Sequence, residues 1–247
     1  MEINTIYNED CLETLKKMPD NFLDLIITSP PYNKGYWSKN REMSNQDIFK
    51  TKSRKITYGD FDDNLEPVEY ENNQRNLIKE CLRVLKPSGS LFYNHIDILR
   101  ELTTIHPKYV YDFPLKQIII WDRASTPKID VSYFYPIIEY IFWFKKDKNS
   151  VPKFDRNNAV FQKCIWKINP EKNNDHPAPF PLQLPTNIIL ATTDEGDLVY
   201  DPYMGSGTTA IACVKTKRNF IGSELWSEYI DEANQRIKNF KKQPTLF

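Results

Sequence analysis

Short apolar runs alternate with amphipathic stretches along most of the chain. The apolar runs predict β-strands, at residues 1–7, 22–27, 90–94, 115–121, 137–144, 197–200 and 219–221. The amphipathic stretches predict helices, at residues 11–18, 68–85, 96–105, 182–192, 210–217 and 227–240. Strands that alternate with helices are typical of an α/β fold with a mostly parallel sheet.

The stretch Thr28-Ser29-Pro30-Pro31-Tyr32-Asn33 directly follows the apolar run at residues 22–27. Consecutive prolines lack the N–H donors of a strand and restrict the residue before them, so the chain must leave the sheet there in a stiff turn. The turn brings a hydroxyl, a proline carbonyl and an aromatic ring to the carboxyl end of a strand, where ligands bind in open α/β sheets. We expect it to bind a planar molecule that carries an amino group, such as a nucleobase.

A second stretch, Asp201-Pro202-Tyr203-Met204-Gly205-Ser206-Gly207-Thr208-Thr209, joins a predicted strand to a predicted helix. Its glycines allow a ligand to approach the backbone closely. Glu224 follows Gly205 by 19 residues, the spacing at which an acid binds ribose hydroxyls in dinucleotide-binding units. The third glycine of the dinucleotide fingerprint and the lysine of a P-loop are both missing. A nucleoside without phosphates therefore fits best, and S-adenosylmethionine is one.

The chain has 247 residues, enough for one α/β domain with a small appendage. Lysine plus arginine and aspartate plus glutamate number 33 each, which argues against non-specific coating of nucleic acid but leaves room for a local basic face. The cysteines form no CxxC pair, so we expect neither zinc nor disulfides, but reduced thiols in a cytoplasmic protein. The N-terminus carries no signal sequence, and the most apolar run, at residues 137–144, is too short for a membrane span.

Two polar segments interrupt the alternation of strands and helices. Residues 34–67 combine basic and aromatic side chains, which suits the backbone and bases of a nucleic acid; the alternative is a solvated loop whose aromatic residues pack back on the core. The DNA-binding candidates in this loop or lid are Lys34, Tyr36, Trp37, Lys39, Arg41, Lys50, Lys52 and Arg54. Residues 145–175 are charged and irregular and form a candidate target-recognition insert.

Together these motifs resemble the amino-directed DNA methyltransferases of the beta class, in which the catalytic motif precedes the cofactor motif. Thr28 to Asn33 resembles the catalytic (S/D/N)PPY motif. Asp201 to Thr209 resembles DPFxGSGTT, with Tyr203 where phenylalanine is usual, and Gly222 to Glu224 resembles GxE. The same family shows an RvLKpgG element, matched at residues 83–89, and an HPxxxP segment, matched from His176 to Pro181.

The resemblance covers most of the chain and implies a single catalytic domain over residues 1–247. It implies the Rossmann-like fold of methyltransferases that use S-adenosylmethionine (SAM): a seven-stranded, mostly parallel sheet with helices on both faces and one antiparallel hairpin. It also implies SAM as the cofactor, no metal, and double-stranded DNA as the substrate. A second copy of the chain in a homodimer and a cognate restriction endonuclease are candidate partners.

The resemblance assigns catalysis to Ser29, Pro30, Pro31 and Tyr32. Ser29 Oγ and the Pro30 carbonyl would accept hydrogen bonds from the amino group of a flipped-out base, and Tyr32 would stack on its ring. The implied cofactor-binding residues are Asp10, Cys11, Thr28, His176, Pro177, Asp201, Tyr203, Gly205, Ser206, Gly207, Thr208 and Glu224. Asp201 would hold the methionine ammonium and Glu224 the ribose. Ile138-Glu139 stands where many relatives carry His-Glu, which leaves a contact at that position open.

Serine at the first motif position is found more often in enzymes that methylate the 4-amino group of cytosine, and aspartate or asparagine in those that methylate the 6-amino group of adenine. Ser29 therefore favours cytosine-N4, with adenine-N6 as the alternative. A more remote alternative is a non-catalytic DNA-binding module with the same fold, which the intact motifs oppose. Methylation of protein glutamine or RNA is opposed by the order of the motifs, and a dinucleotide oxidoreductase by the missing glycine.

Overall fold

The computed structural model describes residues 1–33, 36, 64–99, 104–124, 134–155, 163–170 and 180–242. Within these ranges one sheet contains eight strands in the order β1-β10-β9-β2-β3-β7-β6-β8. The strands are β1 (Thr5–Tyr7), β2 (Leu23–Thr28), β3 (Leu85–His95), β6 (Leu115–Asp122), β7 (Ile138–Lys145), β8 (Ile165–Lys167), β9 (Leu198–Asp201) and β10 (Asn219–Ser223). Only β7 runs antiparallel to its neighbours, β3 and β6. The predicted mostly parallel α/β sheet is confirmed.

The sheet has one strand more than the predicted seven. The additional strand, β8, lies within the predicted insert at residues 145–175 and pairs in parallel with β6, at the edge of the sheet. The strand has three residues, of which only Trp166 is buried. Three residues are too few for an alternation of apolar and polar positions to stand out in the sequence. Pairing with the edge of β6, a tertiary interaction, creates this strand.

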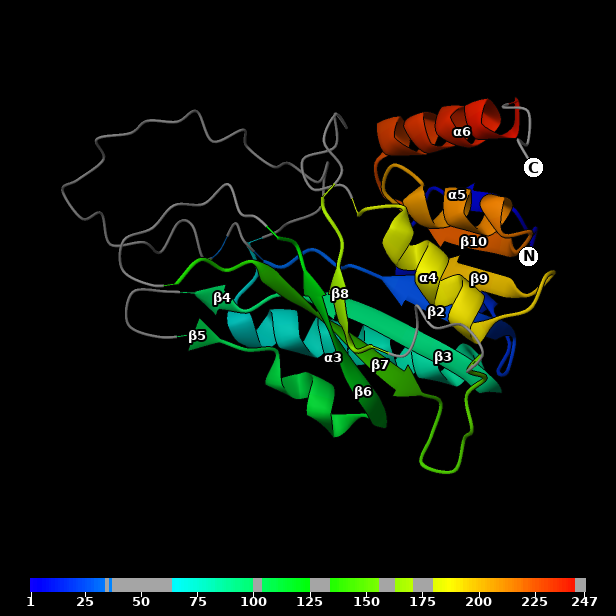
Figure 1. The fold of residues 1–247 in the computed structure, drawn as a ribbon. Helices are drawn as coiled ribbons and strands as arrows, with labels where there is room; N and C mark the ends of the chain where they lie inside the picture. The colour runs from blue at the N-terminus through cyan, green and yellow to red at the C-terminus, as the bar shows by residue number, and fades with distance from the viewer. Residues whose placement is uncertain are drawn as a thin grey trace, which may run out of the picture.

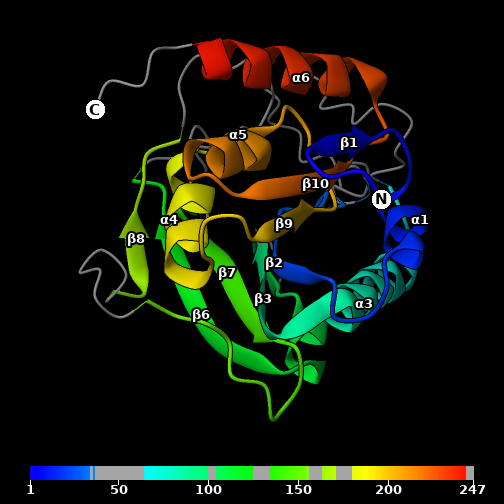
Figure 2. The same cartoon turned by 90° about the vertical axis from the view of Figure 1, so that its right-hand side faces the viewer.

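Helices cover both faces of the sheet, as predicted (Figures 1 and 2). The helices α1 (Cys11–Lys17) and α3 (Pro67–Val84) lie together on one face. The helices α4 (Gln183–Thr192), α5 (Thr208–Lys215) and α6 (Ser227–Lys242) lie on the other. Alternate residues of a strand point to opposite faces, so Ile26 packs in the core under α1 and α3 while Leu25 and Ile27 pack in the core under α4 and α5. Burial on both faces explains the continuous apolar run of β2.

The prediction of a helix at residues 96–105 was wrong. The described ends of this segment are β4 (Ile98–Leu99) and β5 (Thr104–Ile105), which pair antiparallel with each other. Asp97 anchors the segment, because its carboxylate hydrogen-bonds the His106 ring at 2.7 Å and accepts a hydrogen bond from the Tyr140 hydroxyl at 3.0 Å. Contacts between distant residues thus override the helical spacing of the apolar side chains. A short 3₁₀ helix, η1 (Lys108–Asp112), follows and was not predicted.

In the part of the chain that the structure describes, none of the helices combines the length and the apolar character needed to cross a membrane.

Candidate active site

The predicted catalytic turn leaves the sheet at the end of β2, between β9 and β3. Its hydroxyl groups lie close together: Ser29 Oγ is 2.7 Å from the Tyr32 hydroxyl. The turn is held from behind, because the buried Tyr70 hydroxyl lies 2.9 Å from the Pro31 carbonyl oxygen and 3.0 Å from Nε2 of His95. The Tyr32 ring is only 8% exposed and lies 4.9 Å from the His95 ring, centroid to centroid. The predicted stacking of Tyr32 on a base stays a prediction.

Asn33 ends the turn in a left-handed conformation with φ of 55°. Asparagine adopts this conformation more readily than most residues. Its amide then forms a pair of hydrogen bonds with the backbone of Leu65: Nδ2 donates to the carbonyl at 2.7 Å and Oδ1 accepts from the N–H at 2.8 Å. The end of the catalytic turn is therefore fixed to the segment that leads into α3.

Three polar residues near the turn, Asn94, Glu139 and Arg123, were not among the predicted site residues. Asn94 Nδ2 lies 2.7 Å from both the Tyr32 hydroxyl and Glu139 Oε2. Glu139 Oε1 in turn accepts a hydrogen bond from the Arg123 guanidinium at 2.8 Å. These bonds hold Glu139 within the protein, and the contact left open at Ile138-Glu139 stays an open prediction. Asn94 and Arg123 were missed; the available signal was their position at the ends of two predicted strands.

The described residues contain three buried side-chain atoms without a hydrogen-bond partner: Thr28 Oγ1, Asn94 Oδ1 and Arg123 Nε. Thr28 ends β2, Asn94 lies one residue before the end of β3, and Arg123 directly follows β6. An unpaired buried polar atom costs about 1–3 kcal/mol, so such atoms are rare unless they serve a purpose. Their concentration around Ser29 marks this edge of the sheet as a polar site rather than as ordinary core.

The predicted glycine loop joins β9 to α5, with positive φ at Gly205 (52°) and Gly207 (84°). Gly207 also packs tightly on α6, because a Cβ at this position would lie 2.8 Å from the Cβ of Ala233. Between the glycines, the carbonyl and the hydroxyl of Ser206 both accept hydrogen bonds from Arg236 of α6 at 2.6 Å. The sequence thus specifies a loop whose backbone is held by α6 and kept free of side chains at both glycines.

Two carboxyl groups lie beside this loop, the buried Asp201 and the half-buried Glu224. Asp201 accepts hydrogen bonds from the Thr209 hydroxyl at 2.6 Å and from the backbone N–H of Tyr203 at 3.0 Å. Burial nevertheless raises the pKa of Asp201 to about 7. Glu224 accepts hydrogen bonds from the N–H groups of Gly205 at 2.9 Å and Trp226 at 3.0 Å, and burial raises its pKa as well. Both groups would be stabilised in their ionised forms by a cationic or hydrogen-bond-donating ligand.

Asp10 and Cys11, two of the predicted cofactor-binding residues, lie at the start of α1. Asp10 caps this helix, since its carboxylate accepts a hydrogen bond from the N–H of Leu12 at 2.8 Å. Cys11 is buried in the core cluster against which Tyr203 packs, and burial raises the pKa of its thiol to about 12. The tyrosine that replaces the usual phenylalanine of the glycine motif thus links that motif to α1.

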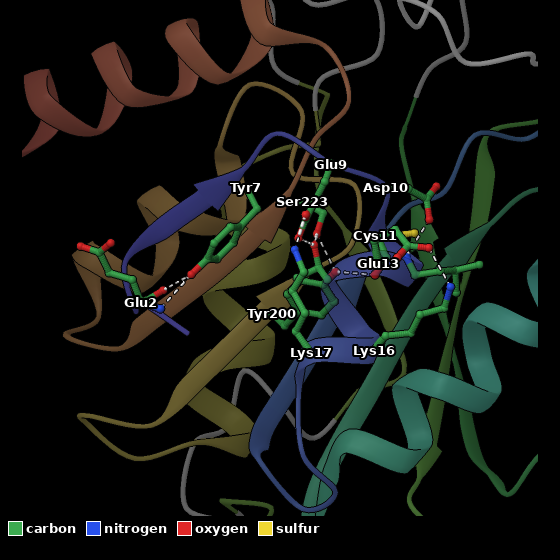
Figure 3. A network of polar contacts seen from close by, with 12 residues as sticks. Glu2, Tyr7, Glu9, Asp10, Cys11, Glu13, Lys16, Lys17, Tyr200 and Ser223 are labelled. Atoms are coloured by element: carbon green, nitrogen blue, oxygen red, sulfur yellow. Dashed lines mark hydrogen bonds and ion pairs between the residues drawn. The ribbon is translucent and has the colours of Figure 1, made fainter.

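Figure 3 shows further polar contacts that hold α1 against the sheet. The Tyr200 hydroxyl of β9 donates to the Cys11 carbonyl at 3.3 Å and lies 2.7 Å from the Ser223 hydroxyl of β10. Ser223 continues through Thr14 to Glu9, with hydrogen bonds of 2.7 and 2.9 Å. This buried chain sets the position of Asp10 and Cys11 relative to the glycine loop.

The sheet brings the two predicted motifs to neighbouring strand ends. β2 pairs with β9 in parallel, with Leu25 opposite Val199 and Ile26 opposite Tyr200. Neighbouring strands lie about 4.8 Å apart, so the chain segments that begin at Ser29 and at Asp201 leave adjacent strands at the same edge. The remaining site candidates fall outside the described residues, namely Lys34, Trp37, Lys39, Arg41, Lys50, Lys52, Arg54, His176 and Pro177; Tyr36 is described and half-buried.

This fold, with a glycine loop, a following acid and a proline turn at adjacent strand ends, defines an enzyme of the SAM-dependent methyltransferase class. The family model described as DNA methylase, for N6- and N4-directed enzymes, matches residues 23–235. The chain therefore belongs to the family of DNA amino-methyltransferases, which use SAM.

Individual relatives agree with this assignment. The type II methyltransferase M.BglII of Bacillus subtilis is 29% identical over 270 residues, covering 94% of this chain and 68% of the relative. M.HinfI of Haemophilus influenzae is 27% identical over 260 residues, covering 98% and 70%. Among solved structures, the PvuII DNA methyltransferase (cytosine-N4-specific) has a TM-score of 0.71 at 24% identity, covering 100% of this chain and 89% of that one. A DNA modification methylase of Thermus thermophilus, complexed with SAM, has a TM-score of 0.67 at 24% identity, covering 94% and 91%. These two structures establish the shared fold.

Proposed function

We propose that this enzyme methylates the 4-amino group of cytosine at a specific sequence in double-stranded DNA. The proposal rests on the position of Ser29. Its neutral hydroxyl lies at the carboxyl end of β2, next to the end of β9, which bears Asp201 and the glycine loop. In the family, serine at this motif position is found more often in enzymes that act on cytosine than in enzymes that act on adenine.

The residues at the β9 and β10 strand ends fit SAM. Each oxygen of the Glu224 carboxylate accepts one backbone N–H and retains a lone pair for a ribose hydroxyl. Asp201 is buried with its pKa raised to about 7, as expected of a carboxyl group that lacks a neighbouring cation. We assign Asp201 to the methionine ammonium, Glu224 to the ribose, and Asp10, Cys11 and Tyr203 to the adenine side. When bound there, SAM supplies an electrophilic sulfonium methyl group.

The residues of the catalytic turn orient the target amino group. That nitrogen is conjugated with its ring and is reached only when the base leaves the duplex, at a cost of a few kcal/mol. Ser29 Oγ and the Pro30 carbonyl accept hydrogen bonds from its N–H groups, so that the nitrogen lone pair faces the methyl donor. Alignment of this kind lowers a barrier by roughly 7–11 kcal/mol, which removes the need for a strong base. The Tyr32 ring supports the flipped base from one side.

The test is to incubate plasmid DNA with the protein and SAM, digest the DNA to nucleosides and identify the modified nucleoside by mass. N4-methylcytosine supports the proposal. N6-methyladenine overturns the choice of base in favour of the alternative substrate. DNA binding without any methylated nucleoside, from protein that binds SAM in a titration, overturns the proposed catalysis in favour of a binding module.

A further inference from the structure

A chain of hydrogen bonds runs from a partly buried ion pair to the hydroxyl that the proposed reaction uses. Arg123 bonds Glu139 at 2.8 Å, Glu139 bonds Asn94 at 2.7 Å, Asn94 bonds Tyr32 at 2.7 Å, and Tyr32 bonds Ser29 at 2.7 Å. We infer that the Arg123–Glu139 pair is a positioning device for Ser29 and acts through Asn94 and the Tyr32 hydroxyl. This inference rests on the proposed methyl transfer. It means that residues outside the proline motif hold the catalytic turn in position.

The direction of these hydrogen bonds follows from the ion pair. A carboxylate paired with a guanidinium accepts hydrogen bonds and donates none. Asn94 must therefore turn its NH₂ group, and not its carbonyl oxygen, toward Glu139 Oε2. The other N–H of the same group is the donor at 2.7 Å to the Tyr32 hydroxyl oxygen.

Tyr32 has one hydroxyl proton, and the described residues place two acceptors near it. Ser29 Oγ lies at 2.7 Å and Glu139 Oε2 at 3.5 Å. The shorter distance lies within the normal range of an O–H···O hydrogen bond and the longer one lies outside it, so in the inferred arrangement the Tyr32 proton goes to Ser29. This bond occupies one lone pair of Ser29 Oγ. The second lone pair faces the longer, 3.4 Å contact with Asn94 Nδ2 and is the proposed acceptor for an incoming amino N–H.

The unpaired carbonyl oxygen of Asn94 fits the orientation that the ion pair imposes on the amide. Asn94 is 1% exposed and its Oδ1 has no hydrogen-bond partner in the described residues. Turning the amide over would give this oxygen the Tyr32 hydroxyl as a donor, but it would also bring a carbonyl against the Glu139 carboxylate. The ion pair thus holds the amide in an orientation that leaves one buried acceptor unpaired and keeps a donor on Tyr32.

The test is a double-mutant cycle on the rate of methyl transfer in a single turnover, with saturating SAM and DNA. Glu139→Gln preserves the shape of the side chain but removes its charge, so the Asn94 amide is free to turn. We expect the rate to fall at least tenfold in the Tyr32 protein and less than twofold in a Tyr32→Phe background, where the relay is already cut. The dissociation constant for SAM should stay within twofold in all four proteins.

Equal losses in both backgrounds, or no loss in the Tyr32 protein, would overturn the inference while leaving methyl transfer by the wild-type enzyme, and so the proposed function, intact. Asn94→Leu provides a second route if Glu139→Gln fails to fold, and it should show the same dependence on Tyr32. The matched control is Asp24→Asn, which breaks the ion pair of Asp24 with Lys86, 2.8 Å apart, at the other end of β2. It should lower stability without changing the transfer rate of the folded protein; a tenfold slower rate in this control would make the Glu139 effect a general consequence of lost ion pairs.

Discussion

The affinity for SAM should decrease as the pH is lowered from 8 to 6, because Asp201 becomes protonated. The pKa of this carboxyl is raised to about 7 by burial, and an ammonium bound beside it would hold it ionised. In the protein without SAM, roughly nine-tenths of Asp201 is protonated at pH 6 and roughly one-tenth at pH 8. Binding should therefore weaken about tenfold from pH 8 to pH 6. The sign is that of a proton released on binding.

The stability of the protein without cofactor should show the opposite dependence. Because the folded pKa of Asp201 lies above its ordinary value of 3.8, the stability that this group contributes is fully present below about pH 3.8 and is lost as the pH rises through about 7. Cofactor binding offsets that loss. The increase in melting temperature produced by SAM should therefore be larger at pH 8 than at pH 6.

Isothermal titration in buffers of different ionisation enthalpy measures both the affinity and the number of protons released. The Asp201→Asn variant is the control, because the ammonium of SAM itself titrates at about 7.7–8.0 like other α-amino groups and affects both proteins equally. The ratio of the two affinities should change about tenfold across this range, in the direction of stronger wild-type binding at high pH. A constant ratio would show that Asp201 does not face the ammonium.

Three further outcomes are expected. Ser29→Ala should slow methyl transfer by roughly 10²-fold with little change in SAM affinity; equal loss of both, by rapid quench and titration, would contradict its assigned role. Gly207→Ala should lower the free energy of unfolding, measured in urea, by about 2 kcal/mol or more, because φ is 84° and the new Cβ would lie 2.8 Å from Ala233. Gly196→Ala is the control: its φ is 89° but its Cβ would meet no neighbour, so it measures the backbone strain alone and should cost less. Tyr200→Phe should lower stability by about 1–3 kcal/mol by removing a buried hydroxyl that bonds both α1 and β10; an unchanged urea midpoint would refute that structural role.

The elements that the sequence predicts well are those whose pattern is decided within the element. The continuous apolar run of β2 follows from burial on both faces, and α3 shows its apolar side through Leu77, Ile78, Cys81 and Leu82. Residues 96–105 carry a similar spacing, yet Asp97 and His106 bond each other and the segment pairs with itself. That choice depends on Tyr140, which lies far along the chain, so local spacing alone could not reveal it.

The same distinction separates the predicted site residues from those that were missed. The proline turn and the glycine loop impose backbone conformations, and such constraints are legible in the sequence because few residue types meet them. Asn94, Arg123 and Arg236 act only through side chains that reach other segments. A single asparagine or arginine at a strand end or on a helix carries no such signature, and its role becomes visible when the partners are placed.

The order of the two motifs along the chain has no effect on the site because the sheet topology decides their positions. After β9 the chain forms α5 on one face of the sheet, and after β2 it leads to α3 on the opposite face (Figure 2). Adjacent parallel strands whose chains leave toward opposite faces open a crevice at their carboxyl ends, and ligands of open α/β sheets bind there. The pairing of β2 with β9 therefore brings the proline turn and the glycine loop to the same edge of the sheet, although Ser29 and Asp201 lie far apart in the sequence. The proposed base and the proposed methyl donor would meet at that edge.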